Sequence, residues 1–151
     1  MATRESIETA NYSPLRLTRK DLRGIEVRPG MSWFVGADRR AAAEHLWMSR
    51  IVIHRQVGVS PVHHHAESEA AIYALRGRSA YFFGPELRER IDLEEGDFLF
   101  IPAWAIHAEA VLSADPVEII MARSTSSPKS VNLPDVRVPN EVLQAAGIAT
   151  T

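Results

Sequence analysis

Cysteine is absent from the 151 residues of the sequence. This absence excludes disulfide bonds, thiolate metal sites and cysteine nucleophiles, so any bound metal must rest on histidine, aspartate or glutamate. A large excess of one charge is also missing, because 17 basic and 19 acidic residues give a net charge of −2. Without a strong basic field, nucleic acid and anionic membranes are not expected partners.

Long apolar runs are missing as well. The first residues read MATRESIETANYSPLRL and lack the apolar run of about seven or more residues that a signal peptide needs. No later stretch approaches the roughly 18 apolar residues of a membrane span. We therefore expect a soluble, cytoplasmic protein with no membrane partner.

The chain has the length of one domain, and 46% of its residues are hydrophobic, which argues against disorder. Residues 1–14 are polar and read as a flexible N-terminal arm. Residues 15–130 are expected to form a barrel. Residues 131–151 form a C-terminal tail, with a short helix expected at EVLQAAG.

Short strand signals dominate the middle of the chain, with turns every 8–12 residues. The predicted strands are 25–36 (a hairpin), 47–57, 70–75, 79–83, 87–93, 98–101, 107–112 and 117–123. Closely spaced short strands without a strongly periodic helix predict an all-β sandwich or barrel.

Histidines supply the chemically most informative pattern. Three of the six are consecutive, and in an extended chain residues i and i+2 point to the same side, so His63 and His65 share a face while His64 points away. Two such imidazoles can bind one cation at about 2.0–2.2 Å. His107 begins a later strand and is the candidate for a third ligand. The alternative interpretation of the tract is a solvated polar loop.

Both histidine segments resemble the two sequence motifs of the cupin superfamily, over about residues 45–123. The first motif matches at Gly58, His63, His65 and Gly77, and the second at Gly96, Pro102 and His107. This resemblance implies a cupin double-stranded β-helix, which is a jelly-roll barrel of two antiparallel sheets.

The sequence also departs from the motifs. Ala70 stands where the family has a ligand glutamate, and Glu69 is one residue away, so it faces inward only if a β-bulge occurs there. Trp104 and Val111 replace the glycine and the asparagine of the second motif. We expect a site of three histidines with an open fourth position, and Glu69 or His54 as alternative fourth ligands.

By this resemblance, each chain would hold one divalent metal ion on His63, His65 and His107. Zinc is the first candidate, and iron, nickel and manganese are also compatible with imidazole. Neutral imidazoles leave the full charge on the metal, which could then polarise a carbonyl group or lower the pKa of a bound water.

A pocket with apolar walls is expected around the metal, suited to a flat or hydrophobic small molecule. Its candidate lining residues, which could equally be simple core, are Trp47, Ile72, Phe98, Phe100, Trp104 and Met121. His64 and Glu69 are candidates for moving a proton during catalysis, although both could also be surface side chains.

The segments HHHAESEAAIYALRG and MARSTSSPKSVNLPD resemble the small stand-alone bacterial cupins, some of which are polyketide cyclases. That resemblance implies aldol cyclisation and dehydration in antibiotic biosynthesis. An Fe(II)-dependent dioxygenase and a non-enzymatic binder of small molecules are the alternatives. Residues 15–22, read as an edge strand or one helical turn, and residues 25–35 could extend a partner's sheet, which predicts a homodimer.

Overall fold

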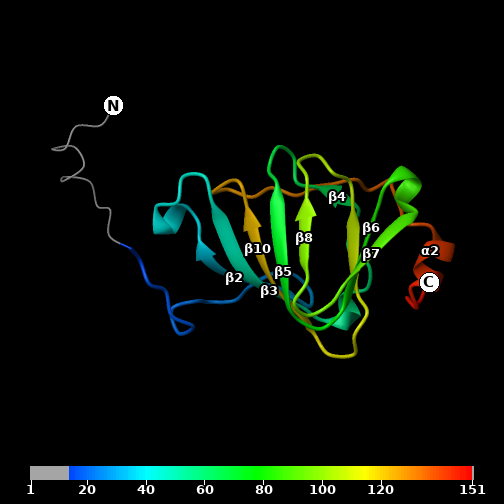
Figure 1. Cartoon of the computed structure of the whole chain (residues 1–151), viewed down its shortest axis with the longest axis horizontal. Coiled ribbons are helices and arrows are strands. Elements are labelled where there is room, and N and C mark those ends of the chain that lie inside the picture. Colours follow the sequence, from blue (N-terminus) through cyan, green and yellow to red (C-terminus); the bar gives the residue numbers. More distant parts are fainter. Residues whose placement is uncertain (1–13, 151) are drawn as a thin grey trace.

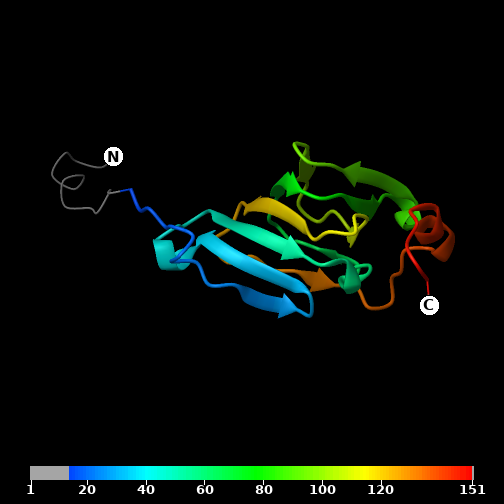
Figure 2. The ribbon, with the colours of Figure 1, turned by 90° about the horizontal axis from the view of Figure 1, so that it is seen from below.

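The computed structural model describes residues 14–150, and its core lies between two antiparallel β-sheet layers (Figures 1 and 2). The larger sheet has six strands. Their spatial order is β1 (Ile25–Arg28), β2 (Met31–Ala37), β3 (Trp47–Ile53), β10 (Val117–Arg123), β5 (Ala70–Arg76) and β8 (Phe98–Ile101).

The facing layer is assembled from two smaller sheets. The three-stranded sheet has the order β7 (Glu89–Leu93), β6 (Ser79–Phe83) and β9 (Ala108–Val111), and the other pairs β11 (Val131–Asn132) with β4 (His63–His64). Isolated bridges join Val59 to Ala110 and His63 to His107, so the segment ending in β4 continues the layer beyond β9. The predicted all-β fold of two antiparallel sheets is confirmed.

Helical structure is limited to short pieces. These are the 3-10 turns η1 (Arg39–Ala41), η2 (Arg55–Val57) and η3 (Pro85–Leu87) and the helix α2 (Asn140–Ala145). Helix α2 lies in the tail and places Val142 and Leu143 on an apolar cluster around Phe82, on the outer side of the three-stranded sheet (Figure 1). Within residues 14–150, no helix has the length and apolar character needed to cross a membrane.

Strand β3 shows how the sequence sets the inner face. Its side chains alternate, so that Trp47, Ser49, Ile51 and Ile53 are buried, as the sequence pattern predicts. Ile51 lies opposite Ile119 of β10 in register. Such cross-strand pairs, repeated over β3, β10 and β5, fill the barrel and fix its register.

A matched pair of phenylalanines tests this view of the core. Phe82 is 0% exposed and Phe98 is 78% exposed. We expect Phe82→Ala to lower the free energy of unfolding by about 3–5 kcal/mol, because it leaves a cavity. Phe98→Ala should cost less than about 1.5 kcal/mol, since it removes only surface packing against Tyr73. Denaturant unfolding measures both, and equal losses would contradict the layer assignment.

The N-terminal region differs in part from its prediction. Residues 15–22 form no strand and contain a single turn at 19–21, closed by a hydrogen bond from Asp21 N to Thr18 O of 3.0 Å. Residues 1–13 of the predicted arm lie outside the described residues. Strand β1 is an edge of the larger sheet and exposes Ile25 and Val27. The homodimer through this region stays a prediction.

Candidate metal centre

A direct backbone pairing brings the two histidine segments together. His63 N donates to His107 O at 3.0 Å, and His107 N donates to His63 O at 2.9 Å. In such a doubly bonded antiparallel pair the two side chains project to the same side. Since His65 is two residues after His63, it shares that side. The local strand geometry therefore brings three imidazoles together, although His107 follows His63 by 44 residues and His65 by 42.

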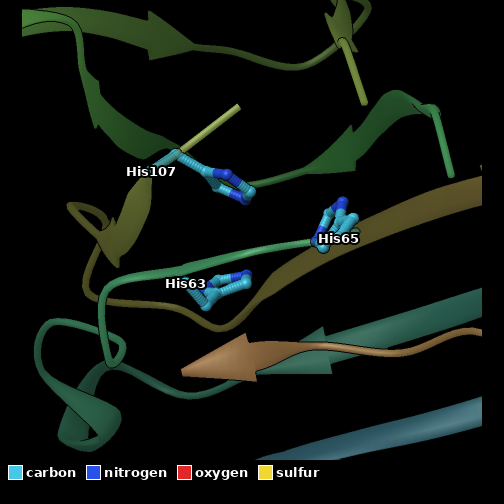
Figure 3. Close-up of side chains that lie close together, drawn as sticks. All are labelled: His63, His65 and His107. Atoms are coloured by element: carbon cyan, nitrogen blue, oxygen red, sulfur yellow. The ribbon is translucent and has the colours of Figure 1, made fainter. Parts of the chain in front are cut away.

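The three rings face one another inside the barrel (Figure 3). One nitrogen of each ring lies within 4.8 Å of the corresponding nitrogens of the other two. The ring centroids are 4.4 Å apart for His63 and His107, 4.8 Å for His65 and His107, and 5.3 Å for His63 and His65. This spacing allows three nitrogens to reach one ion at ligand distances of about 2.0–2.1 Å.

Backbone carbonyls orient two of the rings. Nδ1 of His63 lies 2.9 Å from Pro61 O, and Nδ1 of His107 lies 2.9 Å from Ala105 O. A carbonyl only accepts, so Nδ1 carries the proton and Nε2 keeps its lone pair for a metal. Nδ1 of His65 is buried and has no partner among the described residues. The donor set therefore fits a divalent cation.

Burial keeps the imidazoles of His65 and His107 neutral. It lowers the pKa of His65 to about 2, helped by the charge of nearby Arg123. Burial also lowers the pKa of His107, with His63 adding to the effect. Neutral imidazole is the form that binds metal, so little proton release opposes binding at neutral pH.

A fourth protein ligand is not found within residues 14–150. Glu69 and His54 are both exposed and lie outside the histidine cluster. The pairing of β5 with β8 keeps a regular register from Ala70 onward, so no bulge turns Glu69 inward. The geometry leaves coordination positions open, which is the arrangement of catalytic rather than structural zinc sites.

The rings open onto a cavity of about 50 Å³ between the sheets. Its apolar wall comes mainly from β2, β3 and β10 and includes Trp33, Ile51 and Met121. Of the other predicted pocket residues, Trp47 and Ile72 are buried in the surrounding core and do not line the cavity.

Three predicted pocket residues lie elsewhere. Phe98 and Phe100 are 78% and 58% exposed, because β8 turns Leu99 and Ile101 inward instead. Leu99 pairs with Ile72, whose side chain is in the core, and directly opposed residues share a face. Neither phenylalanine therefore contributes to an interior pocket.

Trp104 is the third of these residues, and it is 61% exposed. It follows β8 with a φ of 64° in the left-handed region, which glycine adopts without strain. The family motif has glycine at this position, and the backbone keeps that conformation here. The indole ring lies 5.4 Å from the ring of His64, whose Nδ1 accepts from Ala66 N at 3.0 Å. His64 thus points away from the metal centre, as the strand period predicts.

Glu109 was not among the candidates from sequence, although its position two residues after His107 predicts the same inward face. It lines the cavity and forms a 3.0 Å ion pair with Arg28 of β1. Burial alone would raise the pKa of its carboxyl group, but His63 and Arg28 outweigh burial and lower the pKa. Glu109 is therefore a largely buried carboxylate that is ionised at neutral pH.

Two further polar groups face the same cavity. Tyr81 is buried there, and burial together with Glu109 raises the pKa of its hydroxyl group, which stays protonated. Arg123, at the end of β10, is 2% exposed. Arg50 of β3 lies outside this cavity, where it pairs with Glu118 at 3.2 Å and lies over the ring of Phe34.

The family described as "Cupin domain" matches residues 50–123, the part of the chain that carries all three histidines. No curated protein matches the chain. Among solved structures, the polyketide cyclase RemF from Streptomyces resistomycificus is 20% identical, with a TM-score of 0.68. The alignment covers 87% of this chain and 94% of RemF.

Two other solved structures share the fold. Oxalate decarboxylase from Lactobacillus farciminis is 19% identical with a TM-score of 0.64, and the match covers 76% of this chain but 34% of that enzyme. This chain thus spans about a third of its length. KdgF from Halomonas sp. is 19% identical with a TM-score of 0.58, covering 71% of this chain and 92% of KdgF. At these identities the similarity establishes the fold.

Proposed function

The chain contains a cupin domain, and from that premise we propose that it is a metal-dependent enzyme that activates a carbonyl group of a small molecule. The observation that carries this proposal is the cluster of His63, His65 and His107, whose nitrogens lie within 4.8 Å of one another with no fourth ligand among the described residues. A divalent ion held there, with zinc as the first candidate, would polarise a carbonyl oxygen.

The residues around the cluster suit this chemistry. Ile51, Ile119 and Met121 line the cavity and exclude bulk water from the reacting group. Hydrogen bonds to backbone carbonyls hold the rings of His63 and His107 in one orientation. A rigid ligand set of this kind holds the carbonyl in one position.

Glu109 is the proposed base. Its carboxylate lies in the cavity, and the ion pair with Arg28 holds it in place and keeps it ionised. It would accept a proton from the carbon next to the activated carbonyl. The protonated hydroxyl of Tyr81 lines the same cavity and could donate a hydrogen bond to the substrate. This assignment replaces His64 and Glu69, whose side chains lie outside the cavity.

The specific reaction that we propose is polyketide cyclisation. A carbon–carbon bond forms between the deprotonated carbon and a ketone carbon of the same chain. Glu109 then returns its proton to the new alkoxide, which gives a β-hydroxy ketone. In the dehydration that follows, the hydroxyl group leaves as water with a second hydrogen from the attacking carbon, and a carbon–carbon double bond forms. The cavity of about 50 Å³ admits the reacting carbonyl end and not a whole polyketide. Support for the reaction class comes from RemF, a polyketide cyclase with the same fold over 94% of its length.

A second candidate is an Fe(II)-dependent dioxygenase. Three histidines with open positions also suit Fe(II), and the small cavity has room for a diatomic molecule. A purely structural metal in a non-enzymatic binder has less support, because structural sites are usually closed by a fourth protein ligand.

A small diketone tests the proposed reaction. Heptane-2,6-dione cyclises by intramolecular aldol addition and loss of one water to 3-methylcyclohex-2-enone, which is followed by its ultraviolet absorption. We expect the zinc-loaded protein to accelerate this reaction, and the protein treated with a chelator to lose the acceleration. Oxygen consumption is recorded on the same samples. Metal-independent turnover would contradict the proposal, and substrate-dependent oxygen uptake with iron would favour the dioxygenase.

A further inference from the structure

Arg123 is a buried cation that faces the metal centre. The residue is 2% exposed and lines the cavity of the three histidines, and its Nη2 donates to His65 O at 3.4 Å. Nε and Nη2 also donate to Ser68 Oγ at 3.0 and 2.6 Å, and Nη2 donates to Lys129 O at 2.8 Å. Each of these acceptors is neutral.

No carboxylate lies within ion-pair distance of Arg123 among residues 14–150. The guanidinium group of an arginine keeps its positive charge at neutral pH. Buried charges are costly unless they are paired. An anion from outside the described protein residues would supply the missing partner.

The charges around the cavity also favour a bound anion. The carboxylate of Glu109 is already balanced by Arg28 at 3.0 Å. The three histidines are neutral ligands and would leave the full charge of a divalent ion in place. With Arg123 nearby, the cavity gathers positive charge that no group among the described residues neutralises. A bound anion is therefore favoured over a neutral molecule of the same shape.

The hydrogen bonds of Arg123 leave Nη1 of its guanidinium group available to a ligand. All of those within the described residues use Nε and Nη2, which fixes the plane of the guanidinium. Nη1 makes none there, and an arginine carries five N–H donors in total. A group held in one orientation, with donors to spare beside a cavity, is suited to a planar carboxylate.

We propose that Arg123 binds the carboxylate of a substrate whose ketone oxygen lies at the three-histidine centre. The substrate class is then a small oxo acid, or a larger molecule that ends in one. This inference rests on the proposed function, because it takes the carbonyl group to be bound at the histidines. Arg123 would select and orient the substrate, while Glu109 moves the proton.

Acetoacetate and its neutral counterpart acetoacetamide provide the test. Their binding to the zinc-loaded protein is measured by isothermal titration calorimetry for the natural sequence and for Arg123→Met, with Arg55→Met as an exposed-arginine control. We expect Arg123→Met to reduce the preference for acetoacetate at least about tenfold, the effect of losing a hydrogen bond to a charged group. Zinc content and the affinity for acetoacetamide should change little.

An unchanged preference in Arg123→Met would overturn the inference. If that variant does not fold, the Nε resonance of Arg123 in the ¹⁵N-labelled natural protein takes its place. A shift with acetoacetate and none with acetoacetamide supports the inference, and no shift with either overturns it. Failure to bind zinc would instead count against the proposed function. A protein that prefers acetoacetate to acetoacetamide but does not cyclise heptane-2,6-dione would contradict the proposed cyclase. The proposed role of Arg123 would still be supported.

Discussion

Replacing His107 with alanine is expected to abolish stoichiometric metal binding. Its ring is one of three donors, and its backbone pairing with His63 aligns both segments. Changes to groups that merely support metal ligands typically weaken binding about 10–100-fold, so loss of a ligand should cost at least about 100-fold. Competition with a chromophoric zinc chelator measures the affinity of each variant.

His64→Ala and His45→Ala are the matched controls. His64 belongs to the same tract but its ring lies beside that of Trp104, and His45 is exposed before β3. Both variants should keep the affinity of the natural protein within a few-fold. Equal weakening by His64→Ala and His107→Ala would mean that the tract binds metal as a loop, without the geometry of the barrel.

Glu109→Gln is expected to lower the rate of diketone cyclisation by about 10²–10⁴-fold, the usual contribution of a positioned general base. Glutamine keeps the size of the side chain and removes its ability to accept the proton. Glu109 is not part of the histidine cluster, so zinc content should stay at about one ion per chain. Rates and metal content are measured on the same preparation.

Glu69→Gln separates this prediction from the interpretation based on sequence. Glu69 is exposed, and its backbone N donates to Ser124 Oγ at 2.9 Å. Its carboxylate lies outside the cavity, so the rate should change less than about twofold. A larger loss in Glu69→Gln than in Glu109→Gln would contradict the proposed base.

Much of the centre could be predicted from local sequence rules. The i, i+2 spacing puts His63 and His65 on one face whatever the details of the fold. The second motif supplies His107 on an adjacent segment. The same rule applied once more from His107 would have identified Glu109. Arg28, which balances that carboxylate, could not be foreseen, because its contact spans 81 residues.

The structure departs from the predicted pocket at Phe98 and Phe100, in a strand whose sequence does not alternate between apolar and polar residues. The run FLFI of β8 is apolar throughout, so its period does not tell which side is inward. Only its register against Ile72 turns Leu99 inward and leaves Phe98 and Phe100 outside. Arg123 presented the opposite difficulty, because an arginine at a strand end usually reaches solvent. Its burial depends on acceptors in two other segments, Ser68, which is 55 residues away, and Lys129 in the loop after β10.

Elemental analysis of the protein purified without a histidine tag tests the central claim most directly. The account predicts about one divalent ion per chain, retained through dialysis and lost with a chelator, because one nitrogen from each of three imidazoles lies within 4.8 Å of the others. A protein that carries no metal and takes none up on incubation with zinc, iron, nickel or manganese would leave the barrel intact but contradict the metal centre.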